Sequence, residues 1–165
     1  MNIIVDTREK KWEHIKALWD RREVPYTVRK LDVADYMLEG DETFAIDRKH
    51  NLDELCTNLM NRNDSSRFWS EMRRAKSKGM KVIILVEQAN CKNIYDVANW
   101  SSRFSRVTGK VLMKEILRIH YAYNIEFLFC DKRHSANMIL RLLENHDYTE
   151  VKKEEKCQDT KTTMK

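Results

Sequence analysis

The stretch that most constrains the fold is 43–53, where a short apolar run turns abruptly ionic. Residues 44–46 are typical of a buried strand, and Asp47, Arg48 and Lys49 follow where that strand should end. Because alternate side chains of a strand share a face, Asp47 and Lys49 should point one way and Arg48 the other. Such a carboxylate can hold a hard cation, and the lysine can face a phosphate or a water. Taken alone, the pattern is also that of a solvated cluster of salt bridges.

The composition indicates a single soluble, globular domain. The chain has 165 residues, of which 42% are hydrophobic and 35% are charged, with only three glycines and one proline. The net charge of +5 allows a polyanionic partner without requiring one. Four widely spaced cysteines predict free thiols in a reducing compartment, with Cys56 and Cys130 in the core.

Several classes of protein are disfavoured by what the sequence lacks. The N-terminus has no apolar signal segment, and the run 82–86 is too short to cross a bilayer, so we expect a cytoplasmic protein without a membrane partner. Neither glycine-rich phosphate-binding motif occurs, which argues against a nucleotide cofactor. The five histidines show no metal-binding spacing, and only His50, beside Lys49, attracts attention.

The pattern of apolar residues predicts an α/β domain with a mixed sheet covered by helices on both faces. Its first hairpin should be antiparallel and its later strands parallel. Residues 88–108 are predicted to form an exposed basic loop or a short helix. We expect the domain to occupy 1–148 and a polar, disordered tail to occupy 149–165. The strands are expected at 3–5, 26–31, 36–39, 43–49, 81–87 and 125–130, and the helices at 9–22, 51–60, 65–78, 110–123 and 133–145.

The order of the ionic residues resembles the XPF-type nuclease domain, whose hallmark is G-D-x(n)-E-R-K-x3-D. Here the hallmark reads Ala34-Asp35, a spacer, and then 47–53, from Asp47 to Asp53. The resemblance covers roughly residues 1 to 145. Flanking matches are V-D-T-R-E at 5–9, L-D-V-x-D-Y at 31–36, R-F at 67–68 and V-I-I-L-V-E at 82–87.

This resemblance implies a restriction-endonuclease-like fold of the PD-(D/E)xK type and metal-dependent cleavage of DNA, in branched or flap form for the family. Asp35 and Asp47 would hold Mg²⁺ or Mn²⁺ together with the Arg48 carbonyl, and Lys49 would orient or help to deprotonate the attacking water. Further roles would fall to acids near the metal (Glu9, Asp6), to arginines that position the phosphate or brace the carboxylates (Arg8, Arg48, Arg67), to Asp53 as a partner of one of these cations, and to a DNA-contacting surface (Arg103, Arg106, Lys110).

The sequence departs from the family pattern at two positions. Ala34 stands in place of the family glycine, and Asp47 stands in place of the family glutamate, which shortens the reach of the carboxylate by one methylene. Because residues 1–165 leave no room for it beside the nuclease domain, we expect them not to contain the helix-hairpin-helix module of many relatives. Two other interpretations stay open: a non-catalytic DNA-binding or scaffold domain that keeps the fold, and a small α/β protein whose ionic cluster is structural. A homodimer formed through 109–145 is also possible.

Overall fold

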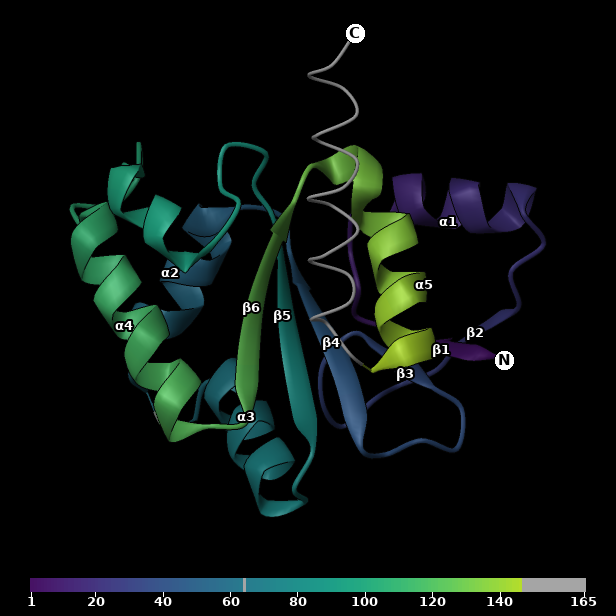
Figure 1. Ribbon diagram of the computed structural model, residues 1–165. Coiled ribbons are helices and arrows are strands. Elements are labelled where there is room, and N and C mark those ends of the chain that lie inside the picture. The colour runs from purple at the N-terminus through teal and green to yellow at the C-terminus, as the bar shows by residue number, and fades with distance from the viewer. Residues whose placement is uncertain (64, 147–165) are drawn as a thin grey trace, which may run out of the picture.

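A six-stranded mixed sheet runs through the computed structural model, which describes residues 1–63 and 65–146 (Figure 1). The strand order is β2-β1-β3-β4-β5-β6. Strand β3 is antiparallel to β1 and β4, whereas the pairs β1–β2, β4–β5 and β5–β6 are parallel. The strands are β1 (Ile3–Val5), β2 (Tyr26–Val28), β3 (Tyr36–Leu38), β4 (Phe44–Lys49), β5 (Lys81–Glu87) and β6 (Ile125–Cys130).

Helices cover both faces of this sheet, as its sequence pattern predicts (Figure 1). The face that carries α1 and α5 encloses one hydrophobic cluster, and the face that carries α2, α3 and α4 encloses the other. The helices are α1 (Glu13–Arg21), α2 (Leu52–Met60), α3 (Arg67–Ser77), α4 (Gly109–Ala122) and α5 (Ser135–Asn145), with 3₁₀ helices η1 (Ile94–Asn99) and η2 (Lys132–His134).

The two central strands place ionic residues at their C-terminal ends. Strands β4 and β5 are buried nearly along their whole length because helices pack on both of their faces. Their parallel register pairs Asp47 with Ile84 and Lys49 with Val86, so that Lys49 and Glu87 lie at the same end of the sheet. An apolar interior therefore ends in charged residues that have little access to water.

Several predicted boundaries differ from the structure. Helix α1 begins at Glu13 rather than at residue 9, and Trp12 precedes it without a side-chain cap. Strand β2 ends at Val28, short of residue 31. Helix α3 begins at Arg67 rather than at residue 65, and the side chain of Ser66 before it accepts the N–H of Trp69.

The segment predicted as a basic loop or a short helix contains both. Asn93 and Asp96 form a capping box that starts η1, and an exposed loop follows it. The predicted tail at 149–165 lies outside the described residues.

The predicted thiols fit the structure where it describes them. Cys56 and Cys130 are buried in the core, as expected, and so is Cys91, and none of the three forms a disulfide. Among residues 1–63 and 65–146, no helix is both long and apolar enough to cross a membrane.

Candidate active site

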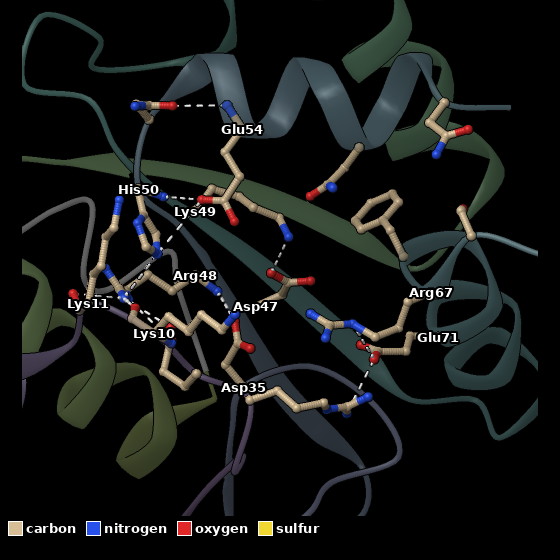
Figure 2. A pocket seen from close by; sticks show the side chains of 17 residues that line it. Lys10, Lys11, Asp35, Asp47, Arg48, Lys49, His50, Glu54, Arg67 and Glu71 are labelled. Atoms are coloured by element: carbon tan, nitrogen blue, oxygen red, sulfur yellow. Dashed lines mark hydrogen bonds and ion pairs between the residues drawn. The ribbon is translucent and has the colours of Figure 1, made fainter. Parts of the chain in front are cut away.

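A cavity of about 730 Å³ lies beside the C-terminal half of β4, between α2 and α3 (Figure 2). Seven of the predicted site residues line it: Arg8, Glu9, Asp35, Asp47, Arg48, Lys49 and Arg67. The two predicted metal ligands, Asp35 and Asp47, therefore face one space rather than opposite sides of the sheet (Figure 2). Among the described residues, Asp6, Asp53, Arg103 and Arg106 lie outside this lining.

Asp47 and Lys49 share one face of β4, as the alternation of a strand predicts. Lys49 Nζ lies 2.8 Å from Asp47 Oδ1 and 5.1 Å from the centre of the Phe68 ring. Burial alone would lower the pKa of Lys49, but the charges of Asp47 and Asp35 outweigh it and raise that pKa. Lys49 is therefore a protonated donor at neutral pH.

Asp35 reaches the cavity from a tight turn that precedes β3. Its backbone N–H donates to the Ile46 carbonyl, and its Oδ2 accepts the Arg48 N–H at 2.8 Å. Ala34 before it has φ of 62°, the left-handed region that favours glycine, which is the family residue at this position. Burial, and then the charges of Asp47 and Glu9, raise the pKa of Asp35 well above its ordinary value.

These acids suit a divalent cation. Asp47 Oδ1 receives no hydrogen bond of acceptable geometry, although the Lys49 ammonium lies close to it as an ion pair. Within 1–63 and 65–146, no three His, Cys, Asp or Glu side chains converge as a group that could hold a metal. Mg²⁺ is commonly bound by only one or two carboxylates and keeps several waters. The carboxylates of Asp35 and Asp47 fit an ion of that kind, which would also reduce their mutual repulsion.

Arg48 points away from Asp47 and Lys49, and it is locked in place. Its guanidinium pairs with Glu9 at 3.0 Å and with Glu87 at 3.1 Å, and it donates to the carbonyls of Lys10 and Lys11. Only 1% of this side chain is exposed. The guanidinium therefore braces the backbone whose N–H holds Asp35, and its donors are already used.

Glu87 continues this buried network to the other side of the sheet. The same oxygen that pairs with Arg48 lies 2.8 Å from His14 Nε2 on α1. Ser135 Oγ at the start of α5 lies 3.3 Å from that same His14 nitrogen. Since Glu87 and Ser135 meet one nitrogen, they do not form the relay of a nucleophilic serine, which uses both ring nitrogens.

Glu71 on α3 is a site residue that the sequence analysis did not identify. It is buried, it accepts the Ala34 N–H at 3.1 Å, and it pairs with Arg8 and Arg67 at 3.4 Å each. Burial and the charge of Asp47 raise its pKa. Its place four residues after Arg67 on one helix was the only sequence signal.

The predicted role of Asp6 near a metal is not supported by its contacts. Both carboxylate oxygens are occupied, by the Arg8 N–H, the Arg8 guanidinium and the Leu31 N–H. Asp6 thus fixes Arg8, which also donates to the Leu31 carbonyl and contacts Glu71.

Asp53 also differs from its prediction, because it accepts a hydrogen bond from Ser102 instead of contacting a site cation. Arg103 and Arg106 are exposed on the loop that contains Ser102. The lining further includes residues to which the sequence analysis gave no role: Lys10, Lys11, His50, Asn51, Glu54, Asn58, Asn61, Ser66 and Phe68.

The fold and this cavity define an α/β domain of the XPF nuclease type. Residues 5–142 match the profile of the ERCC4 domain, and the chain belongs to that family. It is similar in fold to XPF from Aeropyrum pernix, with a TM-score of 0.64 and 18% identity over 93% of this chain and 69% of that one.

A second structure, XPF from Aeropyrum pernix in complex with DNA, gives the same TM-score of 0.64 and 18% identity. There the match covers 87% of this chain and 63% of the other, so this chain spans somewhat less than two thirds of the length of that structure. A comparison with curated proteins gave no match.

Proposed function

We propose that this domain is a divalent-metal-dependent endonuclease that hydrolyses phosphodiester bonds in DNA. The observation that carries the proposal is the cavity in which Asp35, Asp47 and Lys49 converge from separate parts of the chain. Membership of the ERCC4 domain family supports it, as does the complex of a structural neighbour with DNA.

In this reaction the oxygen of a water forms a bond to phosphorus while one phosphorus–oxygen bond of the backbone breaks. Bound Mg²⁺ or Mn²⁺ would supply charge neutralisation and a more acidic water. Lys49, whose pKa the neighbouring acids raise, can donate to an oxygen that gains charge at the phosphate. Its contact with Asp47 holds the ammonium at the cavity wall.

The other wall residues hold the acids in position. Arg48 fixes the backbone at the end of β4 and thereby the N–H that binds Asp35. Glu71 holds the turn at Ala34 through its N–H. Preorganised groups of this kind lower a barrier because they need not rearrange during reaction.

The test is nicking of supercoiled plasmid in Mg²⁺, in Mn²⁺ and in EDTA, by wild type, Lys49→Ala and Asp35→Asn. We expect each substitution to lower the rate by about 100-fold or more, as loss of a charged transition-state contact does. Lys132→Ala is the matched control, since Lys132 is exposed and lies outside the cavity lining. Circular dichroism should show that all variants are folded, and full activity in either site variant would eliminate this site.

A non-catalytic DNA-binding domain is the alternative, and the short acid at position 47 favours it. Asp47 is already ion-paired with Lys49 and reaches less far than the family glutamate. This alternative expects DNA binding without nicking in any metal. A panel of flaps, forks, four-way junctions and linear duplex would show in the same assay whether branched or flap DNA is the substrate.

Self-association is a separate proposal. Helix α4 exposes Val111 and Tyr121, which could contact a second copy. Sedimentation equilibrium measures it directly, and a monomer at all concentrations tested would exclude a homodimer of this domain.

A further inference from the structure

The loop at 101–108, between η1 and α4, presents an aromatic ring to solvent between two arginines. Phe104 is 88% exposed, more than any other large hydrophobic residue among those described. Arg103 and Arg106 beside it are exposed too. Within 1–63 and 65–146 neither arginine has an ion-pair partner, so both guanidiniums are available to an anion.

This loop is closed on itself by serine side chains. Ser102 Oγ accepts the N–H groups of Phe104 at 3.0 Å and Ser105 at 2.9 Å, and Ser105 Oγ accepts the N–H of Val107 at 3.1 Å. A β-bridge between 101 and 108 joins the two ends. The backbone that carries the phenyl ring is therefore ordered before any ligand arrives, which lowers the entropy cost of binding.

The base of the loop is anchored in the core. Trp100 and Val107, at either end, pack against the larger hydrophobic cluster. Gly109 lies so close to η1 that a Cβ on it would stand 2.3 Å from the Val97 carbonyl oxygen and 2.5 Å from that of Trp100. The loop, η1 and the start of α4 thus pack together as one unit, from which Phe104 projects.

Helix α2 connects this unit to the cavity. Asp53 on α2 accepts a hydrogen bond from Ser102 of the loop, whereas Glu54 and Asn58 of the same helix line the cavity. The loop that carries Phe104 and the cavity therefore contact different residues of the same helix, α2.

We propose that Phe104 is a stacking platform for one unpaired base of a nucleic acid whose flanking phosphates pair with Arg103 and Arg106. This inference rests on the proposed DNA substrate and adds a base-binding subsite outside the cavity. An exposed aromatic ring between cations suits single-stranded nucleic acid, because every base has a face to stack and a phosphate on each side. A protein partner would more often bury such a ring within a larger apolar surface, and the loop around it is charged and polar.

The experiment measures binding in EDTA, where metal-dependent cleavage is blocked. The probes are a single-stranded oligonucleotide that carries 2-aminopurine, whose fluorescence reports stacking, and the blunt duplex in which the same base is paired. Phe104→Ala should weaken binding of the single strand by about 5- to 100-fold, the range of one lost aromatic–base stack. It should alter duplex binding by less than about twofold, and Phe104→Trp should restore the single-strand affinity and the fluorescence change.

Two controls separate stacking from charge and from mere exposure. Tyr95→Ala removes a ring that is 69% exposed on η1 and should change neither affinity. Arg106→Ala should weaken the binding of both probes, and it should reduce the slope of log affinity against log salt concentration by about 1.

The outcomes distinguish this subsite from the proposed function. Wild type that binds both probes while Phe104→Ala binds them equally well would overturn the stacking site alone. Equal weakening on both probes would also overturn it, as would a change of oligomeric state in Phe104→Ala, which would assign the ring to a protein interface. Wild type that binds neither probe would overturn the DNA substrate together with this subsite. If Phe104→Ala selectively lost affinity for the single strand and wild type showed no nicking activity, the stacking subsite would be supported and the proposed nuclease activity would be excluded.

Discussion

Replacing Arg48 should destabilise the domain before it affects any chemistry. The family motif places an arginine here, next to the predicted metal ligand Asp47, and the sequence analysis expected it either to position the phosphate or to brace the carboxylates. In the structure its guanidinium forms ion pairs with Glu9 and Glu87 and hydrogen bonds with two backbone carbonyls. Burial alone would lower the pKa of Arg48, but its acidic partners raise it, so the side chain is a fixed cation.

The magnitude follows from what alanine would leave behind. Glu9 and Glu87, each with 4% of its side chain exposed, would lose their cation in a site with little water. Removing one partner of a buried ion pair costs about 3–5 kcal/mol, against a total stability of about 5–15 kcal/mol for a typical domain. Arg48→Lys keeps the charge but cannot span both carboxylates, and we expect it to cost about 2 kcal/mol.

Equilibrium unfolding in urea, followed by circular dichroism, measures these differences. Arg67→Ala is the matched control, because Arg67 also lines the cavity but is 62% exposed and should cost less than about 1 kcal/mol. DNA binding by Arg48→Lys should stay close to that of wild type wherever the protein is folded. If Arg48→Ala were as stable as wild type but no longer bound DNA, the bracing role would be refuted. Arg48 would then be assigned a direct contact with the DNA.

Two further predictions concern Asp6 and Gly109. Burial would raise the pKa of Asp6, but hydrogen bonds from Arg8 and Leu31 outweigh it and lower that pKa, so Asp6→Asn should cost about 2–3 kcal/mol at neutral pH. The stabilisation by Asp6 is present above its pKa in the unfolded chain and is lost as the pH falls through its lower pKa in the folded protein. In urea titrations, the difference in free energy of unfolding between Asp6→Asn and wild type should therefore narrow below about pH 4. A difference that widens there would contradict the prediction. Gly109→Ala should lower the free energy of unfolding by about 3 kcal/mol, since its Cβ would overlap backbone carbonyls of η1. An unchanged melting temperature would show that the loop can shift at little cost.

The sequence predicts this fold well because its signals are periodic and local. The apolar run at 82–86 can only be a buried strand or a short buried helix segment, and its neighbours decide between them. The alternation within β4 likewise places Asp47 and Lys49 together and Arg48 opposite, as the contacts confirm. Boundaries were less accurate: nothing local shows that α1 begins only at Glu13, or that Asp6 turns towards Leu31, a residue far along the chain.

The parts of the site that sequence reasoning missed depend on contacts between distant elements. Glu71 looks like a solvated helix charge until the turn at Ala34 packs its N–H against it. Glu87 ends an apolar strand, and only the approach of α1 gives it His14 as a second partner. The local sequence around Glu71 and Glu87 is ordinary. Their burial results from contacts between distant elements that local patterns do not predict.

The same contacts change which cations can meet a phosphate. The arginines and lysine of the motif are largely occupied, since Arg48 is surrounded by acids, Arg8 is bound to Asp6, and Lys49 faces Asp47. A DNA backbone entering this cavity would first meet side chains that are exposed and not held by acids. In the described part of the chain these are Lys10 and Lys11 at the rim, along with Arg67, whose one contact with Glu71 is long. The motif thus builds the acidic centre, and the affinity for phosphate has to come from residues around it.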